Sequence, residues 1–430
     1  MSRVALIGEN SIEYISLLLD IWNSGDCAAL LDWKIPIDTA VEMMSEANIQ
    51  VCYIERKFFD KISSNYSDIK FIVYDKQKNQ TECLTKEIAN KYFVRDDSSE
   101  AVIIYSSGTT GKSKGIILSH HAINSNADAI IDYMDITKDD CMYIAKPFSH
   151  SSTLTGELLV ALKCGIKLVV APTIVPPRYI LNKIHEYNVT IICLNPMLLS
   201  MCAKEYGKGK YSLSSLKTIY VSGSILNDKE YNLAHKAFEK INIYNVYGLS
   251  EAGPRVSAQC AGYNKTNSVG KPIKGVQIIL LDDNGNRVGI NEYGIIHIKT
   301  PSLFNGYVTG KEKNRSLLDG WFNTGDIGFF DDNNELHILG RTDDVVIINS
   351  HKIYPTDVEK LILKCVDVNE CIVCKSSDEQ LVCLYVSQNE LKTADVKSLY
   401  SVLMAYEIPN KYIKVDSLPR TFNGKIIRKY

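Results

Sequence analysis

The hydrophobic and polar positions of the chain predict strands and helices that alternate over most of its length. Arg3–Ile7 and Cys27–Leu31 are short apolar runs typical of buried strands, and an apolar stripe from Ile12 to Trp22 has helical spacing. Asn10 or Ser11 can cap this helix. Further strands are predicted at Phe71–Tyr74, Ala101–Tyr105, Lys167–Ala171, Thr190–Leu194 and Thr218–Ser222. This alternation is typical of an α/β fold whose doubly wound sheets have helices on both faces.

The pattern changes near residue 270, where short strands and turns replace the alternation. Val276–Leu281, Gly294–Lys299 and Leu336–Leu339 fit a β-rich, barrel-like subdomain over about 270–340. Beyond it, strands and helices alternate again in a shorter segment. We therefore predict a large N-terminal domain over residues 1–340 and a small α+β domain over 341–430, with the boundary at Arg341–Asp344.

Composition and charge exclude several classes of partner. The 430 residues include 48 basic and 50 acidic side chains, giving a net charge of −2 without a run of like charges. Nothing in this balance favours nucleic acid or an anionic membrane surface. No apolar stretch reaches membrane-spanning length, and Val4–Ile7 is too short for the core of a signal peptide. The 12 cysteines are scattered, mostly in apolar runs, as reduced thiols are. A cytoplasmic protein is expected.

The run YSSGTTGKSKG, residues 105–115, follows a predicted buried strand and is rich in glycine, hydroxyls and lysine. Free backbone N–H groups, hydroxyls and lysines suit a phosphate group. A Walker A loop is excluded, because its first glycine would stand at the position of Ser106. Taken alone, the run also fits a plain surface turn.

Five more polar clusters follow in order: Asn245–Glu251 after a predicted strand, Gly320–Asp326 in a predicted turn, Gly340–Asp344, His351–Glu359 and Asn423–Lys425. With the glycine-rich loop, they resemble in order and spacing the motifs of the adenylate-forming superfamily. That superfamily contains acyl- and aryl-CoA synthetases, luciferases and the adenylation domains of peptide synthetases. The resemblance covers almost the whole chain. It implies that a carboxylate attacks the α-phosphate of ATP to give an acyl-adenylate, and that a thiol then displaces AMP.

The resemblance also implies a role for each matching residue. Phosphate contacts are expected from Ser106, Ser107, Gly108, Thr109, Thr110, Gly111, Lys114 and Ser250. Glu251 is the expected Mg²⁺ ligand, since a hard cation prefers carboxylate oxygen. Adenine and ribose contacts are expected from Tyr247, Gly248, Asp326 and Arg341. Lys425 would bridge the attacking carboxylate and the α-phosphate. For the second step, the C-terminal domain would turn about Asp343 and bring His351 and Lys352 to the site.

Each of these residues also has an ordinary structural interpretation. Asp326 after Thr-Gly fits a turn, and Glu251 fits a helix cap. Tyr247 fits a core residue, and Lys425 near the C-terminus fits a solvated lysine. The matched order and spacing of all six stretches favour the functional interpretation.

Pro147–His150 bears on the choice of acid substrate. This segment matches the family motif that gates the acid pocket, and His150 is the expected gate. Peptide-synthetase domains place an aspartate just after this point to pair with an α-amino group. This chain continues with Ser151 to Gly156 and has no aspartate there. Because an unpaired buried ammonium is costly, we expect an aliphatic or aryl acid without an α-amino group.

The motifs do not decide which thiol accepts the acyl group. CoA is the leading candidate, and the phosphopantetheine arm of an acyl carrier protein has the same thiol. A catalytically silent nucleotide-binding paralogue is the alternative from another class, although Lys425, Glu251 and Asp326 are all present. Family members normally have several tens of residues before the strand that begins here at Val4. Ser350 stands where glycine is usual, and its Cβ is expected to narrow the path of the thiol.

Overall fold

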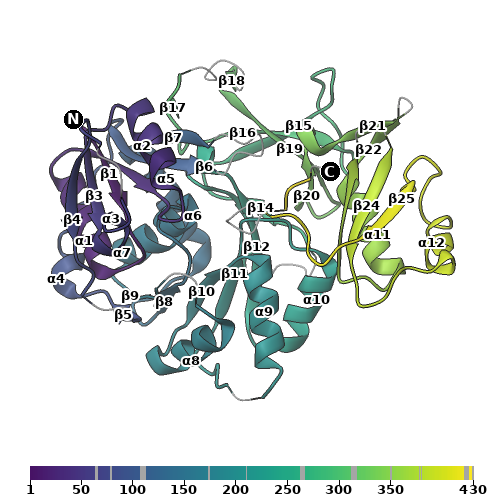
Figure 1. Cartoon of the computed structure of the whole chain (residues 1–430), viewed down its shortest axis with the longest axis horizontal. Coiled ribbons are helices and arrows are strands. Elements are labelled where there is room, and N and C mark those ends of the chain that lie inside the picture. Colours follow the sequence, from purple (N-terminus) through teal and green to yellow (C-terminus); the bar gives the residue numbers. More distant parts are fainter. Residues whose placement is uncertain are drawn as a thin grey trace.

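The structure is a computed structural model. It describes residues 1–62, 66–77, 80–106, 113–172, 175–209, 211–261, 267–310, 317–348, 351–376, 378, 380–420 and 426–428. In Figure 1 the N-terminal sheet lies at the left, a second sheet with its helices lies at the lower centre, and the C-terminal segment lies at the right.

The first sheet has the strand order β17-β7-β6-β2-β1-β3-β4. Its strands are β1 (Arg3–Ile7), β2 (Cys27–Leu31), β3 (Val51–Glu55), β4 (Lys70–Tyr74), β6 (Glu100–Ser106), β7 (Lys114–Ser119) and β17 (Gly306–Tyr307). The strands from β6 to β4 pair in parallel, whereas β7 and β17 are antiparallel to their neighbours. Its helices are α1 (Ile12–Asn23), α2 (Ile37–Glu46), α3 (Arg56–Phe59) and α4 (Lys86–Ala89).

The second sheet has the order β14-β13-β12-β11-β10-β8-β9-β5. Its strands are β5 (Glu82–Cys83), β8 (Cys141–Ile144), β9 (Lys167–Val170), β10 (Ile191–Leu194), β11 (Thr218–Val221), β12 (Asn242–Gly248), β13 (Arg255–Ala258) and β14 (Lys271–Pro272). The accompanying helices are α5 (His120–Met134), α6 (Ser151–Thr153), a π-helix (Leu154–Leu159), α7 (Val160–Cys164), α8 (Pro177–Tyr187), α9 (Pro196–Tyr206) and α10 (Asp228–Ala237).

Successive side chains along the strands point to opposite faces of each sheet and pack in different apolar cores. Both faces of each sheet are therefore buried. Met142 lies in the core between the sheets, with α1, α5 and the π-helix, whereas its neighbour Tyr143 packs with α8, α9 and α10. On the first sheet, Leu6 faces the shared core and Ile7 faces α2. Helices therefore cover both faces of each sheet, which confirms the doubly wound α/β prediction.

The β-rich segment forms an antiparallel sheet of β15 (Gln277–Leu281), β16 (Gly294–Lys299), β18 (Leu317–Leu318), β19 (Trp321–Phe330) and β20 (Leu336–Arg341). After it come a short helix (Thr342–Asp344), β21 (Val346–Ile348), β22 (His351–Ile353), α11 (Pro355–Cys365), β23 (Glu370–Lys375), β24 (Leu381–Val386), α12 (Thr393–Leu399) and β25 (Lys411–Lys414). This last segment packs around its own apolar clusters.

The structure decides one local prediction that was left open and corrects another. Ser11, not Asn10, caps α1, because its side chain accepts a hydrogen bond from the backbone N–H of Tyr14. Asn10 instead binds the backbone of Lys146 and Phe148, and so ties β1 to the loop before His150. Asp326 is not in a turn but inside β19, because Gly325 takes the left-handed conformation (φ 70°) and lets the strand continue.

Candidate active site

Three of the residues expected around adenine and ribose form one hydrogen-bonded cluster. The Tyr247 hydroxyl on β12 donates to Asp326 Oδ2 at 2.5 Å, and Arg341 Nη1 on β20 donates to Asp326 Oδ1 at 3.0 Å. Asp326 and Arg341 face each other in the β19–β20 register. Residues far apart in the chain are therefore joined where the second sheet meets the β-rich sheet.

Burial and charge perturb two groups of this cluster. Burial, followed by the negative charge of Asp326, raises the pKa of Tyr247 well above its ordinary value, so the phenol stays a donor. Burial lowers the pKa of Arg341, but the charge and hydrogen bond of Asp326 outweigh burial, and the net shift is upward. The Tyr247 ring belongs to the central core. The carboxylate of Asp326 is thus fixed between two donors, with acceptor capacity left for a sugar hydroxyl.

A second cluster surrounds Ser250 and Glu251, which lie in a short helix after β12 (Ser250–Ala252). The Tyr307 hydroxyl on β17 donates to Glu251 Oε1 at 3.0 Å. Lys114 Nζ on β7 lies 5.5 Å from the centre of the Tyr307 ring. Ser250 Oγ contacts Ser151 Oγ at 2.9 Å. Tyr307 therefore contacts both the carboxylate of Glu251 and the cation of Lys114, and the Ser250 hydroxyl next to Glu251 in the chain contacts a second hydroxyl.

Glu251 suits a divalent cation. Burial raises the pKa of its carboxyl, and the hydrogen bond from Tyr307 and the charge of Arg341 oppose this shift only in part. A bound cation favours the ionised form and so offsets the cost of burial. Mg²⁺ is commonly held by one or two carboxylates together with substrate phosphates, which fits one carboxylate beside hydroxyls and a lysine.

His150 lies beside the same cluster, one residue before Ser151. Its Nε2 is 3.9 Å from Asp32 Oδ2, and Ser149 Oγ donates to the same carboxylate oxygen at 3.3 Å. Asp32 follows β2 and is 7% exposed. The loop with His150 is therefore held against the carboxyl edge of the first sheet.

Gly248 has a packing role at the end of β12. A Cβ there would lie 2.0 Å from the carbonyl oxygen of Pro254, so only glycine fits. This close approach brings the end of β12 against the chain that follows Glu251.

Several predicted residues lie outside the described residues: Ser107, Gly108, Thr109, Thr110, Gly111, Ser350 and Lys425. The backbone of Ser106 pairs with Lys114 where β6 and β7 flank the glycine-rich run, so this run begins and ends beside the second cluster. Lys352 lies elsewhere: on β22 it forms an ion pair with Asp283, in the turn after β15.

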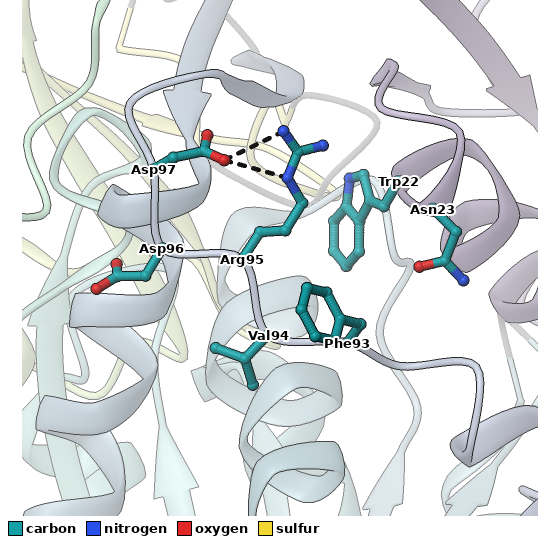
Figure 2. A pocket seen from close by; sticks show the side chains of 7 residues that line it. All are labelled: Trp22, Asn23, Phe93, Val94, Arg95, Asp96 and Asp97. Atoms are coloured by element: carbon teal, nitrogen blue, oxygen red, sulfur yellow. Dashed lines mark hydrogen bonds and ion pairs between the residues drawn. The ribbon is translucent and has the colours of Figure 1, made fainter.

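Tyr307 and Ser151 were not predicted from the sequence as partners of the site. Tyr307 lies in a two-residue strand whose partner, β7, is distant in sequence. A surface depression at the end of α1 contains none of the predicted site residues; its lining consists of Trp22, Asn23, Phe93, Val94, Arg95, Asp96 and Asp97 (Figure 2). No helix in the described part of the chain is both long and apolar enough to cross a lipid bilayer.

The layered sheets and the two clusters at their junction define an α/β enzyme that handles a nucleotide. The model of the AMP-binding enzyme family matches residues 1–308, and the chain belongs to this family. It is 26% identical over 445 residues to the indoleacetate–CoA ligase of Aromatoleum aromaticum, covering 99% of this chain and 86% of that protein. The 2-succinylbenzoate–CoA ligase of Enterococcus faecalis is 27% identical over 438 residues, with 99% and 87% coverage.

A solved structure gives the same fold. The O-succinylbenzoate coenzyme A synthetase from Bacillus subtilis, in complex with ATP and magnesium ion, superimposes with a TM-score of 0.82 at 22% identity. The match covers 99% of this chain and 88% of that chain. Strands β18 to β20 of the β-rich sheet and the C-terminal segment, which lie beyond residue 308, are therefore included in the shared fold.

Proposed function

We propose that the protein is an AMP-forming acid–thiol ligase that activates a carboxylic acid with ATP and transfers the acyl group to CoA. The observation that supports it most is the junction of the two clusters. Asp326, fixed by Tyr247 and Arg341, suits a ribose, while Glu251, Ser250 and Lys114 suit phosphates and Mg²⁺. CoA as the acceptor is supported by the curated relatives, which are named CoA ligases.

In the first step a carboxylate oxygen attacks the α-phosphorus, and the bond from that phosphorus to the bridging oxygen breaks. Pyrophosphate leaves with the electron pair, and an acyl-adenylate remains. Mg²⁺, when bound, neutralises charge on the phosphates. We assign Glu251 to hold it, Lys114 and the hydroxyls of the glycine-rich run to the phosphates, and Lys425 to the developing charge between carboxylate and α-phosphate.

In the second step the thiol sulfur attacks the acyl carbonyl, and AMP leaves as the thioester forms. We propose that residues 1–340 and 341–430 are separate domains and that the smaller one turns about Asp343 between the steps. This motion would release Lys352 from Asp283 and bring it, with His351, toward the path of the thiol. His150 gates the acid pocket, and Asp32 helps to hold its loop.

Release of pyrophosphate from ATP, measured across fatty, aryl and amino acids, tests the proposal. Release with a non-amino acid supports adenylation, and addition of CoA or of a holo carrier protein then identifies the acceptor. Absence of release with every acid, together with measurable ATP binding, would favour a catalytically silent paralogue. The described cysteines, none of which forms a disulfide with another, suit the reducing cytoplasm that we propose as its location.

A further inference from the structure

The side chain of Arg255 is a buried cation that the proposed reaction leaves without a role. Arg255 begins β13, pairs with Gly248 of β12 and is 4% exposed. Two hydrogen bonds of 2.8 Å with the Asn126 side chain fix its backbone. Within the described residues, its guanidinium donates one hydrogen bond, to the Tyr133 hydroxyl at 2.8 Å, and no carboxylate lies within ion-pair distance. The charge of Arg255 does act on the buried carboxyl of Glu157, but that carboxyl forms no ion pair with it. Because an unpaired buried charge is costly, a closer partner from outside the described chain is indicated.

The surroundings of Arg255 have an excess of positive charge. Glu157, in the π-helix, is fully buried, and its nearest cation is Lys146, at 3.0 Å. The charges of Lys146, Glu157 and Arg255 all act on the buried thiol of Cys193 on β10. Burial raises the pKa of this thiol to about 12. Among these three groups, two are cations and one is a carboxylate. Such a cluster attracts an anion and repels an ammonium group.

Arg255 lies within reach of the proposed acid site. Ser151 contacts Ser250 at one end of a continuous helical segment, and Gly156 lies five residues further along it. A Cβ on Gly156 would lie 3.3 Å from Arg255 Nη2, a tight contact, so the glycine lets the guanidinium approach this helical segment closely. At a rise of about 1.5 Å per residue, Ser151 and Gly156 are separated by about 7 Å along the helix. A spacer of a few carbon atoms covers this span.

We propose that Arg255 binds the second carboxylate of a dicarboxylic acid whose first carboxylate is the one activated by ATP. This inference rests on the proposed function and specifies its substrate class. The planar guanidinium presents paired N–H donors that match a carboxylate, and Tyr133 holds it in orientation. The second carboxylate balances the excess charge beside Glu157 and Lys146. Arg255 is thus a specificity-determining residue and takes no part in bond making.

The test compares each dicarboxylic acid with its own monomethyl ester. Pyrophosphate release is measured with malonate, succinate, glutarate, adipate and benzene-1,2-dicarboxylate, and with the five esters. For at least one pair, the wild-type kcat/KM should favour the diacid by about 100-fold, because the ester leaves Arg255 unpaired. Arg255→Gln should reduce this preference to a few fold. Arg3→Gln, which removes a guanidinium that pairs with Glu100 on the first sheet, should retain it.

Every outcome separates the two proposals. If the wild type uses esters as well as diacids, the anion site is wrong and the proposed function stands. If no acid releases pyrophosphate, the proposed function fails, and calorimetric titration with the same acids decides the anion site. Tighter binding of a diacid than of its ester, lost in Arg255→Gln, supports the site; equal binding overturns it. If Arg255→Gln does not fold, Arg255→Lys is used instead. It keeps the positive charge but lacks the paired N–H donors, and it should lower the preference for the diacid over its ester about tenfold.

Discussion

Replacement of Asp326 by asparagine separates the proposed ribose contact from the packing around it. The substitution keeps size and one acceptor oxygen but removes the charge shared by Tyr247, at 2.5 Å, and Arg341, at 3.0 Å. A hydrogen bond to a charged group contributes about 1.5–3 kcal/mol, so the loss of one such bond to ribose costs about 2 kcal/mol. This corresponds to an increase of about 30-fold in the KM for ATP. The Arg341 side chain is 38% exposed, and solvent limits the loss of folding stability to about 1 kcal/mol.

The assay is acid-dependent exchange of pyrophosphate into ATP, with the melting temperature measured on the same preparations. Tyr247→Phe is the matched control, because it removes one donor to Asp326 and keeps the ring. Its KM for ATP should change less than threefold, roughly the effect of a neutral hydrogen bond at the low end of its range. A KM for Asp326→Asn within twofold of the wild type, accompanied by a lower melting temperature, would show that Asp326 is structural and would refute the ribose role.

Four further predictions concern the rest of the site and the fold. Lys425→Ala should lower adenylation by several orders of magnitude with ATP binding retained, since about 3–5 kcal/mol of transition-state stabilisation is lost; adenylation within a few fold of wild type would exclude the role. Glu251→Gln should raise the Mg²⁺ concentration needed for half-maximal activity at least tenfold, as measured by titration after treatment with a chelator; an unchanged titration would remove it from the metal site. Asp343→Pro should spare adenylate formation and impair thioester formation, and equal loss of both would contradict a hinge. Burial lowers the pKa of His120 to about 4, below its unfolded value, so stability should fall as pH decreases from about 6.5 to 4, by up to about 3 kcal/mol; urea unfolding of His120→Leu should show a weaker dependence, and an identical one would assign the effect to other groups.

The sequence allowed prediction of those elements whose pattern is local. The unit β1–α1–β2 appears at its predicted residues, because two apolar runs and one helical stripe leave little choice of secondary structure. The choice between Asn10 and Ser11 as the cap could not be made in this way. It depends on the loop before His150, which reaches Asn10 only in the folded molecule.

The motifs allowed prediction that certain residues of the candidate site lie close together. Tyr247, Asp326 and Arg341 do form one cluster, as their motifs suggested. Arg255 and Tyr307 were missed for a physical reason. The first is an ordinary strand residue until Tyr133, distant in sequence, is packed against it, and the second gains its partner only when β17 pairs with β7.

The position of Tyr307 explains why so short a strand matters. Its hydroxyl binds Glu251 and its ring lies beside Lys114, so one side chain joins the strand after the glycine-rich run to the proposed metal ligand. The backbone N–H of Phe304 adds a bond to the carbonyl of Glu251 at 2.9 Å. Because these contacts cross from the first sheet to the second, a shift of either sheet alone would separate Lys114 from Glu251. The proposed phosphate and metal contacts therefore depend on the packing of the two sheets as one body, and the chemistry of the first step is a property of their junction.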